Sequence, residues 1–181
     1  MKILTTLAIV LLTCLPAAAQ RTHDPLTGRE VDQLREAAQD PDRRIGLLLE
    51  YATERLVAVE RLHKLEAPSD RDVETLASLL DDMATLVDEL DDNLEMYDQH
   101  GEDLRHALRR VLAAEEDFRN RLAMLDHERT MLHRRAYAAA LAVASESVQQ
   151  SQESSRTMLE SQIARKGVLK EKPTRPAAPR E

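Results

Sequence analysis

A seven-residue repeat of apolar side chains restricts this chain to helical architectures. Between residues 73 and 97, apolar residues recur alternately every three and four positions, which is the spacing of the buried seam of a coiled coil. The repeating positions are Val73, Leu76, Leu80, Met83, Val87, Leu90, Leu94 and Tyr97. No proline lies between Pro68 and Pro173, so the strongest helix breaker is absent from this part of the sequence.

The composition favours helices as well. Only 2% of the 181 residues are aromatic, whereas leucine, alanine, glutamate and arginine, which all have high helix propensity, are abundant. Apolar residues make up 43% of the chain, which is enough for a core and argues against global disorder. We therefore predict an all-α fold, an antiparallel helical bundle or coiled-coil hairpin with one long C-terminal helix. The net charge of -8 argues against a general nucleic-acid binder, which needs a clustered basic face.

Capping residues mark the starts of the first three helices. Each start pairs a residue that can accept a hydrogen bond from a free backbone amide with a residue suited to the first turn. These pairs are Thr27 with Glu30, Asp40 with Pro41, and Ser69 with Asp72. The second helix is predicted to run to about Ala67 and the third to end at Gly101. Because the turns between them are short, consecutive helices are expected to be antiparallel neighbours, with Val87 near Leu49 and Glu115.

The fourth predicted helix, which starts at Glu102–Asp103, is too long for its partners. Its first obvious stop is Gly167, so it must either project from the bundle or break. The small side chains of residues 136–144 suit close packing on the first helix or on a second chain. Residues 145–155 are rich in serine, glutamine and glutamate, and we expect a frayed or solvent-exposed helix there.

The N-terminal segment is typical of an export signal. Lys2 is followed by an apolar stretch too short to span a bilayer, and small residues at 17–19 predict cleavage after Ala19. The predicted organisation is a signal peptide over residues 1–19, a helical bundle domain over 20–165, and a disordered, basic, proline-rich tail over 166–181. The product is then periplasmic or secreted. A lipid anchor on Cys14, the only cysteine, is the alternative.

The third predicted helix is strongly acidic. Residues 70–98 contain eleven acidic side chains and one basic side chain, Arg71. The candidate interaction residues occupy outer and flanking heptad positions, and they are Asp81, Asp82, Asp88, Glu89, Asp91 and Asp92. Such a face is either a solvated helix surface or a surface that collects cations or meets a basic partner.

Two charged residues, Glu115 and Arg129, interrupt the apolar seam of the fourth helix. An unpaired buried charge costs several kcal/mol, so each residue needs a partner or water. They could be solvated at the rim, or Arg129 could reach an acidic residue of its own bundle. Alternatively, two fourth helices crossing antiparallel around Leu122 would pair Glu115 of one copy with Arg129 of the other, which makes a homodimer.

No pattern in the sequence predicts an enzyme or a cofactor site. Glu60-x-x-His63 has the spacing of a metal site in a helical bundle, but its apparent partner, Asp103-x-x-His106, falls on the wrong face. We predict neither a metal nor a cofactor, and no catalytic residue. The first hypothesis is an exported, non-enzymatic interaction or scaffolding protein of the bacterial envelope, with a protein partner or a second copy. The alternatives are a bundle that binds a cation or small ligand, and a holdase-like chaperone.

Overall fold

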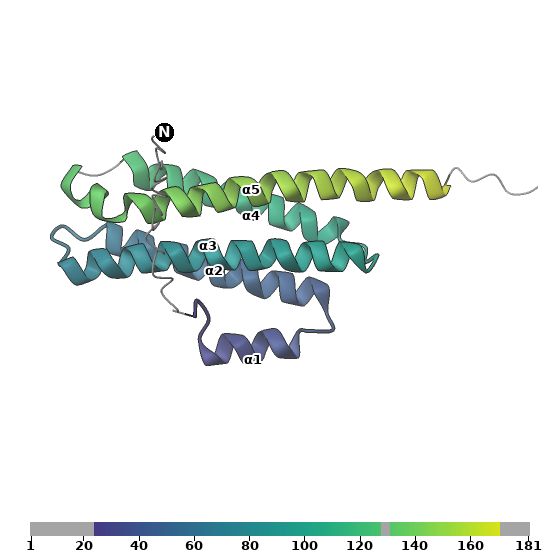
Figure 1. The fold of residues 1–181 in the computed structure, drawn as a ribbon, viewed down its shortest axis with the longest axis horizontal. Coiled ribbons are helices and arrows are strands. Elements are labelled where there is room, and N and C mark those ends of the chain that lie inside the picture. The colour runs from purple at the N-terminus through teal and green to yellow at the C-terminus, as the bar shows by residue number, and fades with distance from the viewer. Residues whose placement is uncertain (1–23, 128–130, 171–181) are drawn as a thin grey trace, which may run out of the picture.

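The computed structural model describes residues 24–127 and 131–170. These residues form α1 (Gly28–Glu36), α2 (Pro41–His63), α3 (Asp70–Gln99), α4 (Arg105–His127) and α5 (Met131–Lys170). Helices α2 to α5 form a bundle, and α1 lies along its outside (Figure 1). The predicted all-α bundle is therefore confirmed. The predicted signal peptide, Cys14 and residues 171–181 of the predicted tail lie outside the described residues.

The helix starts follow the predicted capping chemistry. The Thr27 hydroxyl accepts from the Glu30 amide at 3.3 Å, and the Glu30 carboxylate accepts from the Thr27 amide at 2.6 Å. Ser69 and Asp72 form the same reciprocal pair at the start of α3. Helix α2 ends at His63, four residues earlier than predicted, with Lys64 as its C-cap residue.

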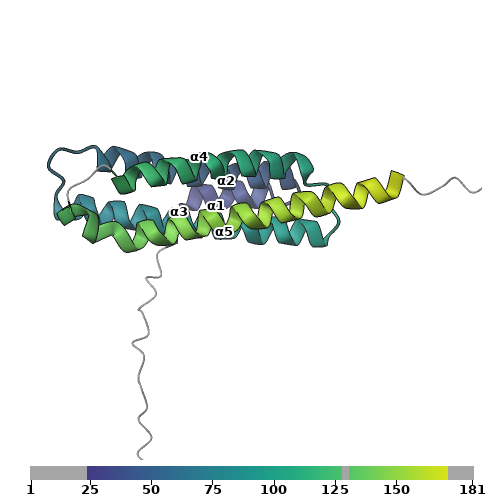
Figure 2. The ribbon, with the colours of Figure 1, turned by 90° about the horizontal axis from the view of Figure 1, so that it is seen from above.

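The order of the helices around the bundle differs from the prediction. Helix α3 packs against α2 and α5, whereas α4 packs against α5 and α2. Figures 1 and 2 together place α3 and α4 at opposite corners, with α3 and α5 running in the same direction. Consecutive helices α3 and α4 are therefore not neighbours. The connection of residues 100–104 can span about 17 Å when extended, which is enough to cross the end of the bundle.

The fourth predicted helix is broken into α4 and α5. The chain reverses after His127, and α5 returns along the bundle and extends past the end of α3 (Figure 1). The break removes the length mismatch, because α5 packs against α4 and α3. Helix α5 continues through Gly167 to Lys170, so the prediction of a disordered tail from residue 166 is wrong for residues 166–170. One glycine costs a helix only about 1 kcal/mol.

The face that α5 presents to the bundle changes character along its length. Buried residues follow a seven-residue repeat on this face, and they are Tyr137, Leu141, Ala144, Val148, Ser151, Ser155 and Gln162. The first four are apolar or aromatic and extend the main core. The last three are polar, and two of them, Ser151 and Ser155, belong to the segment of residues 145–155 in which we expected a frayed or exposed helix. That expectation is wrong, because Ser151 is 1% exposed and Ser155 is fully buried.

The end of α5 is attached to the turn between α3 and α4 by Gln162. Its Oε1 accepts from the buried Leu104 amide at 2.9 Å, and its Nε2 donates to Asp98 Oδ1 at 2.7 Å and to the Glu102 carbonyl at 3.0 Å. Arg165 and Lys166 add ion pairs to Asp98 and Asp103. This contact fixes the register of α5 at the far end of the bundle.

We expect Gln162→Ala to lower the free energy of unfolding by about 1–3 kcal/mol, because the Leu104 amide loses its partner in a buried position. Urea denaturation followed by circular dichroism measures the change. Gln149→Ala, at an exposed position of the same helix, is the matched control and should change the free energy by less than about 0.5 kcal/mol. Equal effects of the two substitutions would contradict this role of Gln162.

Candidate functional site

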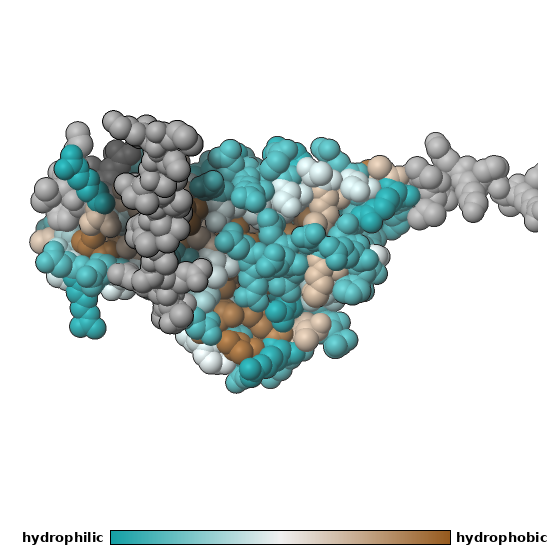
Figure 3. Space-filling view, viewed as in Figure 1, coloured by the Kyte–Doolittle hydropathy of each residue, from teal (hydrophilic) through white to brown (hydrophobic). Residues whose placement is uncertain are grey.

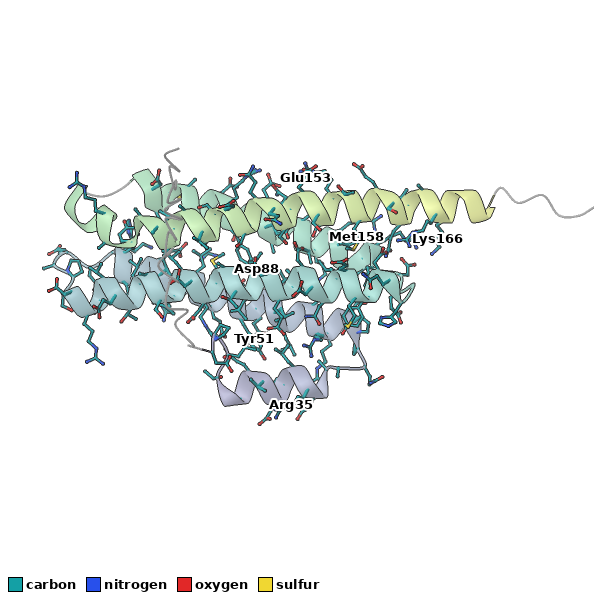
Figure 4. The ribbon with its side chains drawn as sticks, viewed as in Figure 1. Arg35, Tyr51, Asp88, Glu153, Met158 and Lys166 are labelled. Carbon is teal, nitrogen blue, oxygen red and sulfur yellow. The ribbon has the colours of Figure 1, made fainter. Side chains whose placement is uncertain are left out.

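An acidic groove of about 340 Å³ lies between α3 and α5. Its α3 wall consists of Asp88, Asp91, Asp92 and Glu95, and its α5 wall consists of Ser147, Gln150, Ser154 and Met158. None of these lining residues is basic. Figure 4 labels Asp88 on α3 and Met158 on α5, and Figure 3 shows hydrophilic side chains over this face. We call this feature the α3–α5 groove.

The six predicted interaction residues of α3 point in three directions. Asp81, Asp88 and Asp92 are exposed, as predicted. Asp82 is only 8% exposed, and its charge acts on Arg55 of α2. Glu89 is half-buried and pairs with Arg44 of α2 at 3.3 Å, and Asp91 is half-buried against α5. The six residues therefore do not form one exposed face, because α2 and α5 cover the flanking positions of Asp82, Glu89 and Asp91.

The carboxylates of the groove have no cationic partner within residues 24–127 and 131–170. Among the residues that the structure describes, Asp88 and Asp92 make no ion pair, and Glu95 accepts only from the Gln99 side chain, at 3.0 Å. Burial raises the pKa of Asp91, and the charges of Asp88, Asp92 and Glu95 raise it further, against the lowering effect of a hydrogen bond from Ser151. The groove thus carries a negative charge that the described part of the chain does not neutralise.

Behind the groove, Glu115 of α4 lies in the core. Its exposure is 0%, so the interpretation that it is solvated at the rim is wrong. It lies next to Ser151 of α5 rather than opposite Val87, because α5 stands between α3 and α4 on this side. Ser151 Oγ is 2.6 Å from Glu115 Oε1 and 2.9 Å from Asp91 Oδ1, so one hydroxyl links the two carboxyl groups.

The environment of Glu115 disfavours its charged form. Burial raises its pKa to about 7, with a further increase from the charge of Asp91, whereas the hydrogen bond with Ser151 lowers it. Glu115 Oε2 and the adjacent Ser155 hydroxyl are both buried without a hydrogen-bond partner in the described part of the chain. Arg129, predicted as the counterpart of Glu115 in a second copy, lies outside the described residues.

Sequence reasoning missed the α5 half of this site. Ser151 and Ser155 occupy seam positions of the same seven-residue repeat as Leu141, Ala144 and Val148. Following the repeat past the apolar residues would have identified them as buried serines.

Glu60 and His63, which have the spacing of a metal-binding pair, each contact a different helix. Glu60 Oε1 accepts from Arg121 Nε at 2.6 Å. His63 instead packs edge-on against Tyr137, with ring centroids 6.2 Å apart and an interplanar angle of 85°. Within residues 24–127 and 131–170, no group of three or more histidine, cysteine or acidic side chains is arranged to hold a metal ion.

Comparisons with known proteins do not add to this description. No family model, curated protein or solved structure matches the chain. None of the helices in the described ranges combines the length and the apolarity that a membrane span requires. The function is therefore argued from the α3–α5 groove and the buried carboxyl group behind it. Chemically, this arrangement can attract cationic groups and can hold a proton.

Proposed function

We propose that this protein is an exported, non-enzymatic interaction or scaffolding protein of the bacterial cell envelope whose α3–α5 groove binds a basic segment of a partner protein. The observation that carries the proposal is the groove itself, which has four carboxyl groups on one wall and no basic residue on either. The assignment to the envelope depends on the export pattern of residues 1–19.

The distribution of ion pairs around α3 supports a basic partner. Two acidic side chains of α3 that face a neighbouring helix outside the groove are matched by arginines, Glu89 by Arg44 of α2 and Asp98 by Arg165 of α5. The groove acids also face a neighbouring helix, but among the described residues they make no ion pair. Hydrogen bonds between a carboxylate and an ammonium or guanidinium group are stronger than neutral ones, so lysine and arginine side chains of a partner would complete the groove. Met158 offers apolar surface for their aliphatic stems.

The spacing of the carboxyl groups favours a peptide over a single metal ion. Acidic residues three and four positions apart on one helix have Cβ atoms about 5–6 Å apart, which makes a row of charges rather than a cage. A calcium site needs about six to eight convergent oxygen atoms. A basic segment can instead place successive side chains along the row.

We expect the double variant Asp88→Asn/Asp92→Asn to bind a fluorescein-labelled peptide of alternating lysine and alanine about tenfold more weakly than the wild type. The physical reason is the loss of two unpaired carboxylates from the groove. Fluorescence anisotropy at low ionic strength measures the affinity, because salt screens exposed charges.

The matched control for this measurement is Glu74→Gln/Asp81→Asn. It removes the same two charges from exposed positions of α3 that lie outside the groove. Its affinity for the peptide should stay within about twofold of the wild type. Equal weakening in both double variants would indicate attraction to the net charge alone, and saturable binding of calcium in place of the peptide would favour a cation-binding bundle. Either result would overturn the proposal.

A further inference from the structure

Both contacts of Ser151 can be full hydrogen bonds only if one of the two carboxyl groups that it joins carries a proton. Its hydroxyl lies within hydrogen-bond distance of Asp91 Oδ1, at 2.9 Å, and of Glu115 Oε1, at 2.6 Å. A serine hydroxyl has one hydrogen to donate, and an ionised carboxylate can only accept. Two ionised carboxylates would therefore leave one of these short contacts without a hydrogen. With one proton on Glu115, the acid donates to Ser151 and Ser151 donates to Asp91.

The groups that face Glu115 indicate that, of the two carboxyl groups, Glu115 holds the proton. Helix α3 presents Asp91, with Asp88, Asp92 and Glu95 beyond it in the groove, and α5 presents the uncharged Ser151 and Ser155. The arginines that could supply a positive charge are engaged elsewhere. On α4, Arg119 donates to Gln152 at 3.1 Å, and on α2, Arg44 and Arg55 are bound to Glu89 and Glu30.

We propose that Asp91, Ser151 and Glu115 form a proton-binding site that holds the C-terminal half of α5 against α3 and α4 while one proton is present. Loss of this proton leaves two adjacent carboxylates that repel each other. It also removes one hydrogen bond from the bridge and puts an unpaired charge at a position with 0% exposure.

The C-terminal half of α5 is the part of the bundle that such a change can loosen. From Ser151 onward the buried residues are serines and glutamines, and the apolar contacts come only from the partly buried Met158 and Leu159, so fewer apolar contacts oppose the loss of the bridge than in the first half. The apolar half around Leu141 and Val148 does not depend on the proton. The response is thus confined to one end of one helix.

The direction of the pH dependence follows from where the proton binds. Burial, together with the charge of Asp91, raises the pKa of Glu115 to about 7 against the effect of Ser151, whereas a glutamate in the unfolded chain titrates near 4.3. The folded protein therefore binds a proton that the unfolded chain lacks between these values. The stabilisation is fully present below about pH 4, declines as the pH rises, and is lost as the pH passes through about 7.

Hydrogen–deuterium exchange of the full chain tests this site, with rates corrected for the intrinsic effect of pH. Between about pH 5.5 and about pH 8.5, protection of residues 149–163 should fall by about tenfold, whereas protection of residues 44–58 in α2 should not change. Glu115→Gln, which is neutral at both pH values and can donate to Ser151, should keep residues 149–163 protected throughout. Glu146→Gln, at an exposed position of α5, should behave as the wild type.

A second measurement does not require the variants to fold. The ¹³C chemical shift of the Glu115 carboxyl group in the wild-type protein should titrate with a midpoint near 7, well above that of an exposed glutamate. Uniform protection of the wild type at both pH values, persistence of the pH dependence in Glu115→Gln, or an ordinary glutamate midpoint would each overturn the proposal. None of these readouts involves a partner, so failure of the groove to bind a basic peptide would leave this test unaffected.

Discussion

Replacing Arg55 with alanine should release α1 from the bundle and lower the free energy of unfolding by about 3 kcal/mol. Arg55 Nη2 lies 2.9 Å from Oε1 and 2.8 Å from Oε2 of Glu30, and it also donates to the Pro25 carbonyl at 2.8 Å. Side-chain exposure is 13% for Arg55 and 9% for Glu30. Without the arginine, Glu30 would be an uncompensated charge for as long as α1 stays packed, which favours detachment of α1.

Helix α1 depends on this pair because it has few other attachments. Among the described helices, it packs against α2 alone. The hydroxyl of Tyr51, which Figure 4 labels on α2, donates to Gln33 at 3.0 Å. Arg44 Nη1 donates to the Leu34 carbonyl at 2.9 Å. Burial acts to raise the pKa of Glu30, but hydrogen bonds from Arg55 and Thr27 outweigh it and lower the pKa, so the carboxylate is ionised at neutral pH. The stabilisation it gives is lost as the pH falls through this lowered value.

Urea denaturation and the rate of trypsin cleavage at Arg35, an exposed residue of α1, together measure the release. Arg61→Ala, which removes an exposed arginine from α2, is the control. It should change neither the free energy of unfolding nor the rate of cleavage at Arg35. Adding Glu30→Gln to Arg55→Ala should recover part of the lost stability, since the uncompensated charge disappears. If Arg55→Ala matched Arg61→Ala in both measurements, the pair would not hold α1.

The features that could be predicted from the sequence are those that depend on neighbouring residues. The capping pairs at Thr27 and Ser69 act over three residues, and the apolar repeat of α3 sets its buried face directly. The break after His127 could not be predicted in this way, because residues 127–131 contain neither glycine nor proline. The return of α5 is a tertiary effect. Packing the apolar face of α5 against the apolar face of the bundle is more favourable than continuing α4 as one helix.

The same distinction applies to the candidate site. The acidic side of the groove was evident from the charge of residues 70–98 alone. Which of those acids face solvent could not be predicted, because that depends on α2 and α5 lying on both flanks of α3. The position of Glu115 in the seam was correctly identified as unusual, but its partner, Ser151, lies on a helix whose direction depends on the break after His127.

The position of Leu122 distinguishes the bundle from the predicted dimer seam. The sequence suggested that two fourth helices cross at this residue, but in the structure Leu122 is 1% exposed within a single chain. It lies where α4 meets α5, near Leu141. Truncating a leucine at such a position removes its transfer free energy and leaves a cavity, so Leu122→Ala should lower the free energy of unfolding by about 3 kcal/mol.

The loss caused by Leu122→Ala should be the same at all protein concentrations, and the mass in solution should match that of the wild type. If Leu122 instead belonged to an interface between copies, the substitution would lower the mass in solution, and its effect on the melting temperature would depend on concentration. Met124→Ala is the matched control, because Met124 is two residues away on α4 and is 59% exposed. It should change stability by less than about 0.5 kcal/mol. Urea denaturation at two protein concentrations, together with light scattering, distinguishes burial of Leu122 within one chain from burial between two copies. Within one chain, α5 covers Leu122, so the cost of the cavity does not depend on concentration.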